Sequence, residues 1–499
     1  MRRGHGRTAA RPHGSIGAAI TTRRALAVLV SLCGTAPVRP LPAQVDRSRP
    51  PALPPAQPLR VPAVQSARLP NGLELLVVEM HEVPVVNVSL VVRAGSERDP
   101  RDLPGLASFS ANMLDEGAGS RSALDIAEEA AFLGAQFSTA AGYEWTTVSL
   151  HVPRRQLPAA LDLVADVVRR PTFPDSEVTR QRDLRRTAIL QLRDQPTAQA
   201  PIAFNAILYG PTHPYGWPAG GTEASTATLN RERVEEFWRT YYRPNNTRVL
   251  IVGDLTLAEA RRLISERFGS WARGDVPPLP ADEPPAAASR AFYLVDKPGA
   301  AQSVIRIGHV GVARHTPDYY ALEVMNTILG GSFTSRLNQN LRETRGYTYG
   351  AGSGFNYRRL RGPFLATASV VTAKTDSSLI EFFKELRRIR DSVVPDEELA
   401  KARSYIALSL PNEFETTRGT AAQFLDLVLN DLPLDWYRTY IERINAVTVA
   451  DVQRVARGYI NPDHFVVVVV GDRSQIETGI RALNEGPISP RDLWGQTVP

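Results

Sequence analysis

Hydrophobic and polar positions follow a strand-like spacing in some parts of this chain and a helical spacing in others. The changes of spacing mark the expected strands and helices. Asn71-Gly72, a pair typical of a tight hairpin turn, stands between two strand-like runs, and a further Val-rich run at 84–92 predicts another strand. Small and apolar residues at helical spacing follow at 105–114. The first third of the chain therefore predicts paired strands followed by helices.

The same order of elements occurs twice. Residues 241–264 resemble residues 458–480: each has an Asn and Pro pair, a β-branched strand, Gly-Asp and an amphipathic helix. Gly253-Asp254 and Gly471-Asp472 are offset by 218 residues, and the same offset carries the strand at 87–95 onto a strand at 305–313. We predict an α+β fold of two homologous repeats, each a mostly antiparallel sheet with helices packed on one face, arranged as half of a clam-shell.

Two Pro-rich breaks divide the chain at 45–64 and 276–289. The predicted organisation is a signal peptide at 1–44, a Pro-rich tether at 45–65, an N-terminal repeat at 66–275, a linker at 276–290, a C-terminal repeat at 291–485 and a tail at 486–499.

The basic charge of the chain is confined to its start. Residues 1–44 carry seven arginines and no acidic residue, and without them the formal charge of +6 becomes −1. Nothing then favours nucleic-acid binding. Arg23-Arg24 before a short apolar run, with small residues before Gln44, predicts export to a periplasm, or a membrane tether where the leader is kept. The sole cysteine, Cys33, lies in this leader, so the mature chain has no thiol, and no later segment is long and apolar enough to span a bilayer.

The candidate chemistry is defined mainly by what is missing. Six histidines follow the leader, and none is paired at the i, i+4 spacing of a helical zinc site. Phosphate-binding and dinucleotide-binding glycine motifs and the serine hydrolase elbow are also absent. His213, in a Gly- and Pro-rich loop at 210–221, has no acid or serine placed to work with it and is interpreted as structural.

The repeats and several local motifs resemble the insulinase/pitrilysin family of metallopeptidases, the inverzincins, from about Ser66 to Leu483. The resemblance implies a zinc motif H-x-x-E-H on the helix at 105–114, with two His ligands and a Glu base. Here Ser108 and Asn112 stand at the ligand positions and Ala111 at the base position.

A third zinc ligand, a Glu some 75 residues further on, is also implied by the resemblance. Residues 180–200 contain no Glu. We therefore expect no metal and no catalytic residue on this chain alone, and we interpret the helix at 105–114 as a scaffold.

The C-terminal repeat keeps the other part of the pattern. The family's L-R-E-x-x-G-x-x-Y segment reads Leu341 to Tyr349 here. The resemblance implies that Arg342 and Tyr349 bind a substrate carbonyl and the oxyanion that forms on it. A surface ion pair for Arg342 and a strand aromatic for Tyr349 are the structural alternative.

These features predict the non-catalytic subunit of a heterodimeric zinc metallopeptidase, inactive alone. The resemblance implies a half-size partner with an intact H-x-x-E-H that holds the zinc, and peptides or unfolded segments as substrates. One alternative is a periplasmic peptide-binding or scaffolding protein without a proteolytic partner. Another is an independent hydrolase that acts through His213 or Ser108.

Overall fold

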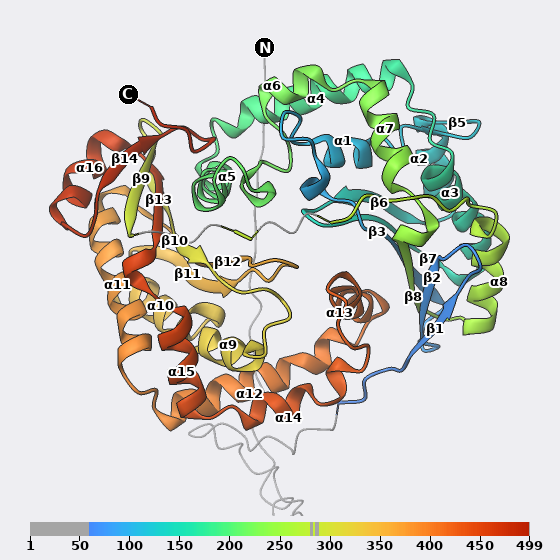
Figure 1. Cartoon of the computed structure of the whole chain (residues 1–499). Helices are drawn as coiled ribbons and strands as arrows, with labels where there is room; N and C mark the ends of the chain where they lie inside the picture. Colours follow the sequence, from blue (N-terminus) through green and yellow to red (C-terminus); the bar gives the residue numbers. More distant parts are fainter. Residues whose placement is uncertain (1–58, 280–282, 285–288, 499) are drawn as a thin grey trace, which may run out of the picture. The chain divides into compact units, whose positions relative to one another are not determined.

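The computed structural model describes residues 59–279, 283–284 and 289–498. The chain divides into residues 1–57 and 58–499, and only the second unit is described here. The predicted signal peptide and most of the predicted tether lie outside the described residues, as does part of the predicted linker. Two six-stranded sheets, each with its own set of helices, make up the described unit (Figure 1).

The N-terminal half contains the first sheet. Its strands are β1 (Val64–Arg68), β2 (Glu74–Glu79), β3 (Val85–Val92), β6 (Gln136–Ala141), β7 (Thr146–Pro153) and β8 (Thr247–Gly253), with a small ribbon of β4 (Gly117–Ala118) and β5 (Arg121–Ser122). Its helices are α1 (Leu106–Asn112), α2 (Ala123–Phe132), α3 (Leu157–Arg169), α4 (Asp175–Leu192), α5 (Pro196–Tyr209), α6 (Glu223–Thr228), α7 (Arg231–Tyr241) and α8 (Leu257–Phe268).

The C-terminal half contains the second sheet. Its strands are β9 (Ala291–Asp296), β10 (Gln302–Val310), β11 (Thr348–Phe355), β12 (Pro363–Val371), β13 (Val466–Gly471) and β14 (Ile488–Arg491). Its helices are α9 (Tyr319–Asn326), α10 (Arg336–Asn338), α11 (Thr375–Asp391), α12 (Asp396–Glu413), α13 (Thr417–Leu429), α14 (Tyr440–Ala446), α15 (Val449–Tyr459) and α16 (Arg473–Ala482), with π-helical turns η5 (Thr327–Gly331) and η6 (Gln339–Thr344).

Both sheets are mixed, with most strand pairs antiparallel. The first has the order β1-β2-β8-β3-β7-β6, with β2 and β8 parallel. The second has the order β11-β12-β10-β13-β9-β14, with β9 parallel to both β13 and β14. Strand β14 falls within the predicted tail, where a four-residue Ile-Ser-Pro-Arg segment has too little hydrophobic pattern to reveal a strand. The predicted α+β class with two sheet-containing repeats is confirmed.

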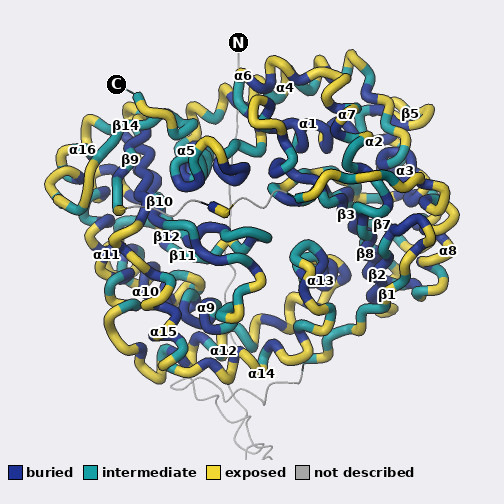
Figure 2. The backbone as a smooth tube through the Cα atoms, in the orientation of Figure 1, coloured by how far each residue is buried: buried dark blue, intermediate teal, exposed yellow. Residues whose placement is uncertain are grey.

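Each sheet also receives a helix from the opposite half, which the sequence did not predict. Along β8, Val249 and Ile251 belong to the core under the N-terminal helices, whereas Leu250 and Val252 pack in one cluster with α13. On the second sheet, alternate valines of β13 form a cluster with α5. Figure 2 shows that part of α5 is buried. The uninterrupted apolar runs of β8 and β13 thus reflect burial on both faces.

A loop of the C-terminal half locks into an aromatic cage of the N-terminal half. The Arg358 guanidinium stacks 4.0 Å from the ring centroid of Tyr143 and 4.5 Å from that of Tyr215. The neighbouring Arg359 pairs with the buried Glu97 at 2.8 Å. Cation–π contacts of desolvated arginines reach about 2 kcal/mol each, so this cage adds to the exchanged helices in joining the halves.

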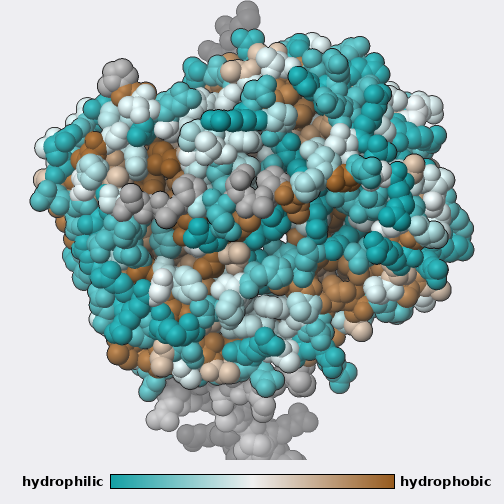
Figure 3. Space-filling view, in the orientation of Figure 1, coloured by the Kyte–Doolittle hydropathy of each residue, from teal (hydrophilic) through white to brown (hydrophobic). Residues whose placement is uncertain are grey.

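Hydrophilic residues predominate on the face shown in Figure 3, with hydrophobic residues scattered among them. No helix within the described ranges is both long and apolar enough to cross a membrane.

Candidate functional site

Helix α1 is positioned by a buried carboxylate at its start. Gly105 precedes the helix with φ 93°, and a Cβ there would lie 2.6 Å from Gly221 Cα, so only glycine fits this turn. The Asp99 carboxylate accepts hydrogen bonds from the backbone N–H groups of Gly105 and Ala107, each at 2.7 Å. These bonds satisfy donors that the first helical turn leaves free.

The three positions that correspond to the zinc motif lie together on α1. Ser108 is half-buried and donates its hydroxyl hydrogen bond to the carbonyl of Ala219 at 2.7 Å. Ala111 is fully buried in the core, and Asn112 is exposed. A methyl group at the base position cannot accept a proton.

Arg185 of α4 fills the space beside these positions. Its Nη1 donates to Ser108 Oγ and to the Gly105 carbonyl, each at 2.9 Å. With its amide oriented to suit its neighbours, Asn112 accepts from Arg185 Nη2 at 3.2 Å and donates to the Ser108 carbonyl at 3.2 Å. The guanidinium also lies 5.0 Å from the centroid of the Phe109 ring. One half-buried cation therefore bridges both positions at which the motif would place ligands.

Sequence reasoning missed Arg185. The only signal in the sequence is the excess of arginine at 180–193. A helix of this composition predicts a charged surface exposed to solvent, and α4 is largely exposed. Only the contacts of its side chain with Gly105, Ser108 and Phe109 single out Arg185 among the arginines of α4.

Burial shapes the electrostatics of this cluster. Burial lowers the pKa of the Arg185 guanidinium to about 10, an effect that Asp99 opposes, so the side chain stays charged at neutral pH. Burial also raises the pKa of Asp99 to about 7, against the lowering effect of the N–H donors of Ala107 and Gly105 and the charge of Arg185. Helix α1 thus lies beside a desolvated positive charge.

The residues around α1 do not fit a zinc ion. Zinc in proteins takes imidazole, thiolate and carboxylate ligands, whereas this surface offers a hydroxyl, a methyl, an amide and a guanidinium. A fixed cation at hydrogen-bond distance from Ser108 would in addition repel a divalent ion. Within residues 59–279, 283–284 and 289–498, no group of three His, Cys, Asp or Glu side chains is placed to hold a metal.

Arg342 lies in η6, and π-helical turns occur frequently at functional sites. Its guanidinium stacks 4.6 Å from the centroid of the Phe333 ring, and its Nε lies 3.3 Å from Glu343. The side chain keeps 37% of its surface exposed. Most of its donors therefore remain available to an incoming group.

Tyr349 stands on β11, the edge strand of the second sheet, and is 89% exposed. The register of β11 against β12 shifts between Thr348 and Ala351, a bulge of the kind that re-aims a side chain. Among the described residues its hydroxyl has no hydrogen-bond partner. The structure thus places Arg342 and Tyr349 on adjacent segments of one half, and neither contacts α1. Their role as substrate donors stays a prediction.

His213 is buried, and it caps the short helical turn η3 (Pro214–Gly216). Its Nδ1 accepts from the N–H of Tyr215 at 3.1 Å, and its ring stacks on Tyr209 at 5.4 Å between centroids. A structural role accounts for these contacts.

Family profiles match both halves. The profile described as insulinase (peptidase family M16) matches residues 75–210, which include α1 and Arg185. The profile described as the peptidase M16 inactive domain matches residues 228–406, which include Arg342 and Tyr349. Together the two profiles of this one family span more than half of the chain.

Individual relatives agree over nearly their whole length. An uncharacterized zinc protease of Mycobacterium tuberculosis is 26% identical over 86% of this chain and 98% of its own, and one of Bacillus subtilis is 24% identical over 80% and 96%. The crystal structure of a peptidase M16 inactive domain from Pseudomonas fluorescens is 26% identical with a TM-score of 0.77, covering 82% of this chain and 98% of that one. A Helicobacter pylori protease, 20% identical, shares the fold with a TM-score of 0.78 over 83% of this chain and 100% of that one. The chain belongs to the insulinase family, peptidase family M16.

Proposed function

We propose that this protein is the non-catalytic subunit of a heterodimeric zinc metallopeptidase. It holds no zinc itself, and its partner is a half-size family member with an intact H-x-x-E-H. The observation that carries this proposal is Arg185: a half-buried guanidinium bonded to Ser108 and Asn112 stands where the family's zinc chemistry would require ligands.

The contribution of this chain would be Arg342 and Tyr349. Both are exposed at neighbouring places and keep hydrogen-bond donors free. Donors of this kind, aimed at a carbonyl oxygen, stabilise the negative charge that develops on it during attack by water. In the complex the partner supplies the zinc, and this chain supplies the oxyanion donors. Peptides and unfolded segments are the proposed substrates.

The test uses the protein purified from its native host together with any chain that copurifies. The complex with Arg342→Ala should cleave a quenched fluorescent peptide about 10- to 1000-fold more slowly than the wild-type complex, the usual range for an oxyanion donor. Arg457→Ala, an exposed arginine of α15, is the matched control and should leave turnover unchanged. Equal turnover in both variants would reduce this chain to an architectural role.

Peptide binding without a proteolytic partner is the second candidate. It is favoured by the edge strands β6 and β11, to which an extended peptide can add as a further strand. A homodimer that binds peptides without cleaving them, and that copurifies with no zinc-bearing chain, would support this function against the first.

The proposed site of action is the periplasm. The support comes from the sequence of residues 1–44, whose arginines precede an apolar run and a small-residue cleavage site. N-terminal sequencing of the protein from the native host tests this: a mature chain that begins near residue 44 supports export, and an intact Met1 contradicts it.

A further inference from the structure

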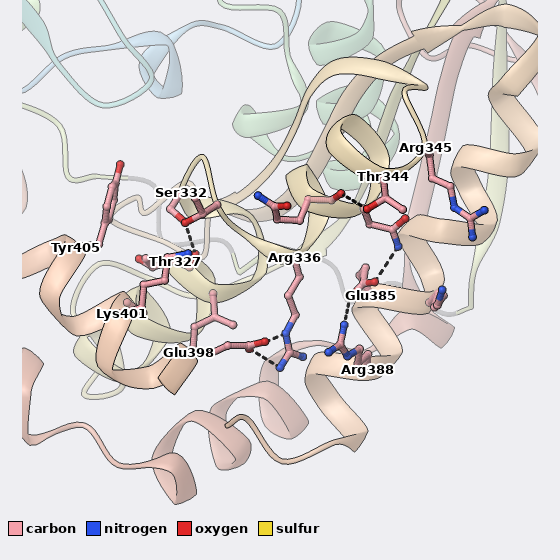
Figure 4. Close-up of a pocket in the computed structure, with 16 residues that line it drawn as sticks. Thr327, Ser332, Arg336, Thr344, Arg345, Glu385, Arg388, Glu398, Lys401 and Tyr405 are labelled. Carbon is pink, nitrogen blue, oxygen red and sulfur yellow. Dashed lines mark hydrogen bonds and ion pairs between the residues drawn. The ribbon is translucent and has the colours of Figure 1, made fainter. Parts of the chain in front are cut away.

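A pocket of about 450 Å³ opens in the C-terminal half between η5, η6, α11 and α12 (Figure 4). We propose that it binds a compact polyanion that carries a phosphate or pyrophosphate group. The proposal does not depend on the function proposed above, because it concerns the isolated chain. The pocket lies beside the proposed substrate-binding residue Arg342, because η6 forms one of its walls and carries that arginine.

Positive charge dominates the lining. Five cationic side chains and two carboxylates line the pocket, and a third carboxylate beside it, Glu381, pairs with Arg345 and Lys384, which leaves an excess of two positive charges. The cations come from several segments of the chain, and two of them share α11. The cations are Arg336, Arg345, Lys384, Arg388 and Lys401, and the carboxylates are Glu385 and Glu398. Mutual repulsion between these cations raises the free energy of the empty pocket, and a bound anion would relieve that repulsion.

Lysines, which are rare in this chain, are concentrated in this pocket. The chain contains only four lysines, Lys297, Lys374, Lys384 and Lys401, against 54 arginines. Two of the four line this pocket. Lysine is a compact charge on a flexible stem that adapts to phosphate oxygens, and Lys401 has no ion-pair partner in the part of the chain that the structure describes. The pocket thus holds a cation that no protein carboxylate neutralises.

Arg336 anchors the floor of the pocket. Only 5% of its side chain is exposed, and Nε and Nη2 bind one oxygen of Glu398 at 2.9 and 2.7 Å, as Figure 4 shows. Its Nη1 is buried and has no hydrogen-bond partner among the described residues, as is also true of several other arginine nitrogens there. A buried donor without a partner costs about 1–3 kcal/mol, and native proteins retain few of them. An anion bound in the pocket would supply an acceptor for this donor.

The size and the remaining lining favour phosphate over a single carboxylate. Hydroxyl groups of Thr327, Ser332, Thr334 and Thr344 surround the cations. A phosphate group brings a charge of about −1.5 to −2 and three strong acceptor oxygens, which suits several donors at once. A volume of about 450 Å³ exceeds inorganic phosphate and lies within the range of small-molecule sites. A pyrophosphate-bearing molecule matches both charge and volume.

The experiment is isothermal titration of the full chain with inorganic pyrophosphate at low and at physiological salt. We expect one bound pyrophosphate per chain, with affinity that falls as salt rises. Lys401→Ala should weaken binding about tenfold, and Lys384→Ala/Lys401→Ala about 100-fold. Lys374→Ala removes the same charge from an exposed lysine outside the pocket, and its affinity should stay within about twofold of wild type.

Lysine labelling gives a second measurement that needs no variant. Pyrophosphate should protect Lys384 and Lys401 from an amine-reactive reagent, as read by mass spectrometry, and leave Lys297 and Lys374 as reactive as before. Absence of pyrophosphate binding, equal loss of affinity in Lys374→Ala and Lys401→Ala, or equal protection of all four lysines would each overturn the proposal. Citrate that binds as tightly as pyrophosphate would overturn the choice of phosphate.

Discussion

Arg185 in the N-terminal half lies beside the segment that resembles the family's zinc motif, and Arg342 in the C-terminal half lies in the segment that resembles its Arg/Tyr motif, but the surroundings of the two arginines differ. Arg185 is desolvated and bonded to Ser108, Asn112 and the Gly105 carbonyl. Arg342 is partly exposed, with its guanidinium stacked on Phe333. One arginine is engaged within the protein, whereas the other leaves donors free for an external group.

The contrast separates an arginine whose donors are satisfied within the fold from one whose donors are largely free. In the N-terminal half the Arg185 guanidinium bridges Ser108 and Asn112, the positions at which the family motif would place zinc ligands. In the C-terminal half nothing internal satisfies Tyr349, whose hydroxyl stands in solvent. Substitutions that remove the internal contacts of Arg185, or the free donors of Arg342 and Tyr349, would test the comparison.

The largest effect is expected on zinc affinity. Restoring the motif with Ser108→His, Ala111→Glu and Asn112→His should not produce a zinc site while Arg185 remains, because a divalent ion about 4 Å from a guanidinium is repelled by roughly 8 kcal/mol at an effective dielectric constant of 20. Adding Arg185→Glu should allow one zinc per chain, measured by competition with a chromogenic chelator. Stoichiometric zinc in the variant that keeps Arg185 would contradict this account.

The pH dependence of stability is the next effect. The pKa of Asp99 is raised to about 7 in the folded chain, from about 3.9 when unfolded, so the folded state holds a proton that the unfolded state has released. Stability should therefore fall as pH rises from about 4 to about 7 and stay level above, by up to about 4 kcal/mol from this group.

Urea unfolding between pH 4.5 and 7.5 measures this slope. Asp99→Asn, which cannot ionise, should have a shallower slope than wild type, whatever its absolute stability. Tyr349→Phe in the other half should keep the wild-type slope. Parallel profiles for wild type and Asp99→Asn would show that the buried carboxyl is not coupled to folding.

The same substitution at the two arginines should have unequal effects on stability. Arg185→Ala removes hydrogen bonds to Ser108 and Asn112 and the contact with Phe109, and we expect a loss of about 2 kcal/mol in the free energy of unfolding. Arg342→Ala at a partly exposed position should change it by less than about 0.5 kcal/mol. Chemical denaturation of the two purified variants decides, and equal losses would remove the distinction between an internal and an external arginine.

The fold was largely predictable because its signals are local. Hydrophobic period and turn residues marked the strands, and the offset of 218 residues between the Gly-Asp pairs revealed the repeat. The exchange of α5 and α13 was not predicted, since a continuous run such as Val466–Val470 tells that both faces are buried but not which helix covers each. That information resides in contacts between residues far apart in the chain.

The candidate site divides in the same way. The positions Ser108 and Asn112 could be singled out through the resemblance to the family's helical motif, because the residues of such a motif are close in sequence; that they bind no zinc stays a prediction. Arg185 could not be identified, since its role depends on how α4 packs on α1 and several arginines of α4 are equivalent in sequence. The exposure of Tyr349 likewise could not be predicted from the sequence, because it depends on the edge position of β11 and on the bulge in that strand.

The smallest expected effect is at Tyr349. Tyr349→Phe keeps the ring and removes only a hydroxyl that contacts no other described residue, so the free energy of unfolding should change by less than about 0.5 kcal/mol. In the proposed complex, turnover of a peptide should still fall about tenfold, less than for Arg342→Ala, because a neutral donor stabilises an oxyanion less than a charged one. Single-turnover rates with saturating peptide separate this loss from weaker binding. Full activity of Tyr349→Phe in the complex would leave Arg342 as the sole oxyanion donor from this chain. The exposed hydroxyl of Tyr349 would then have no role in the reaction.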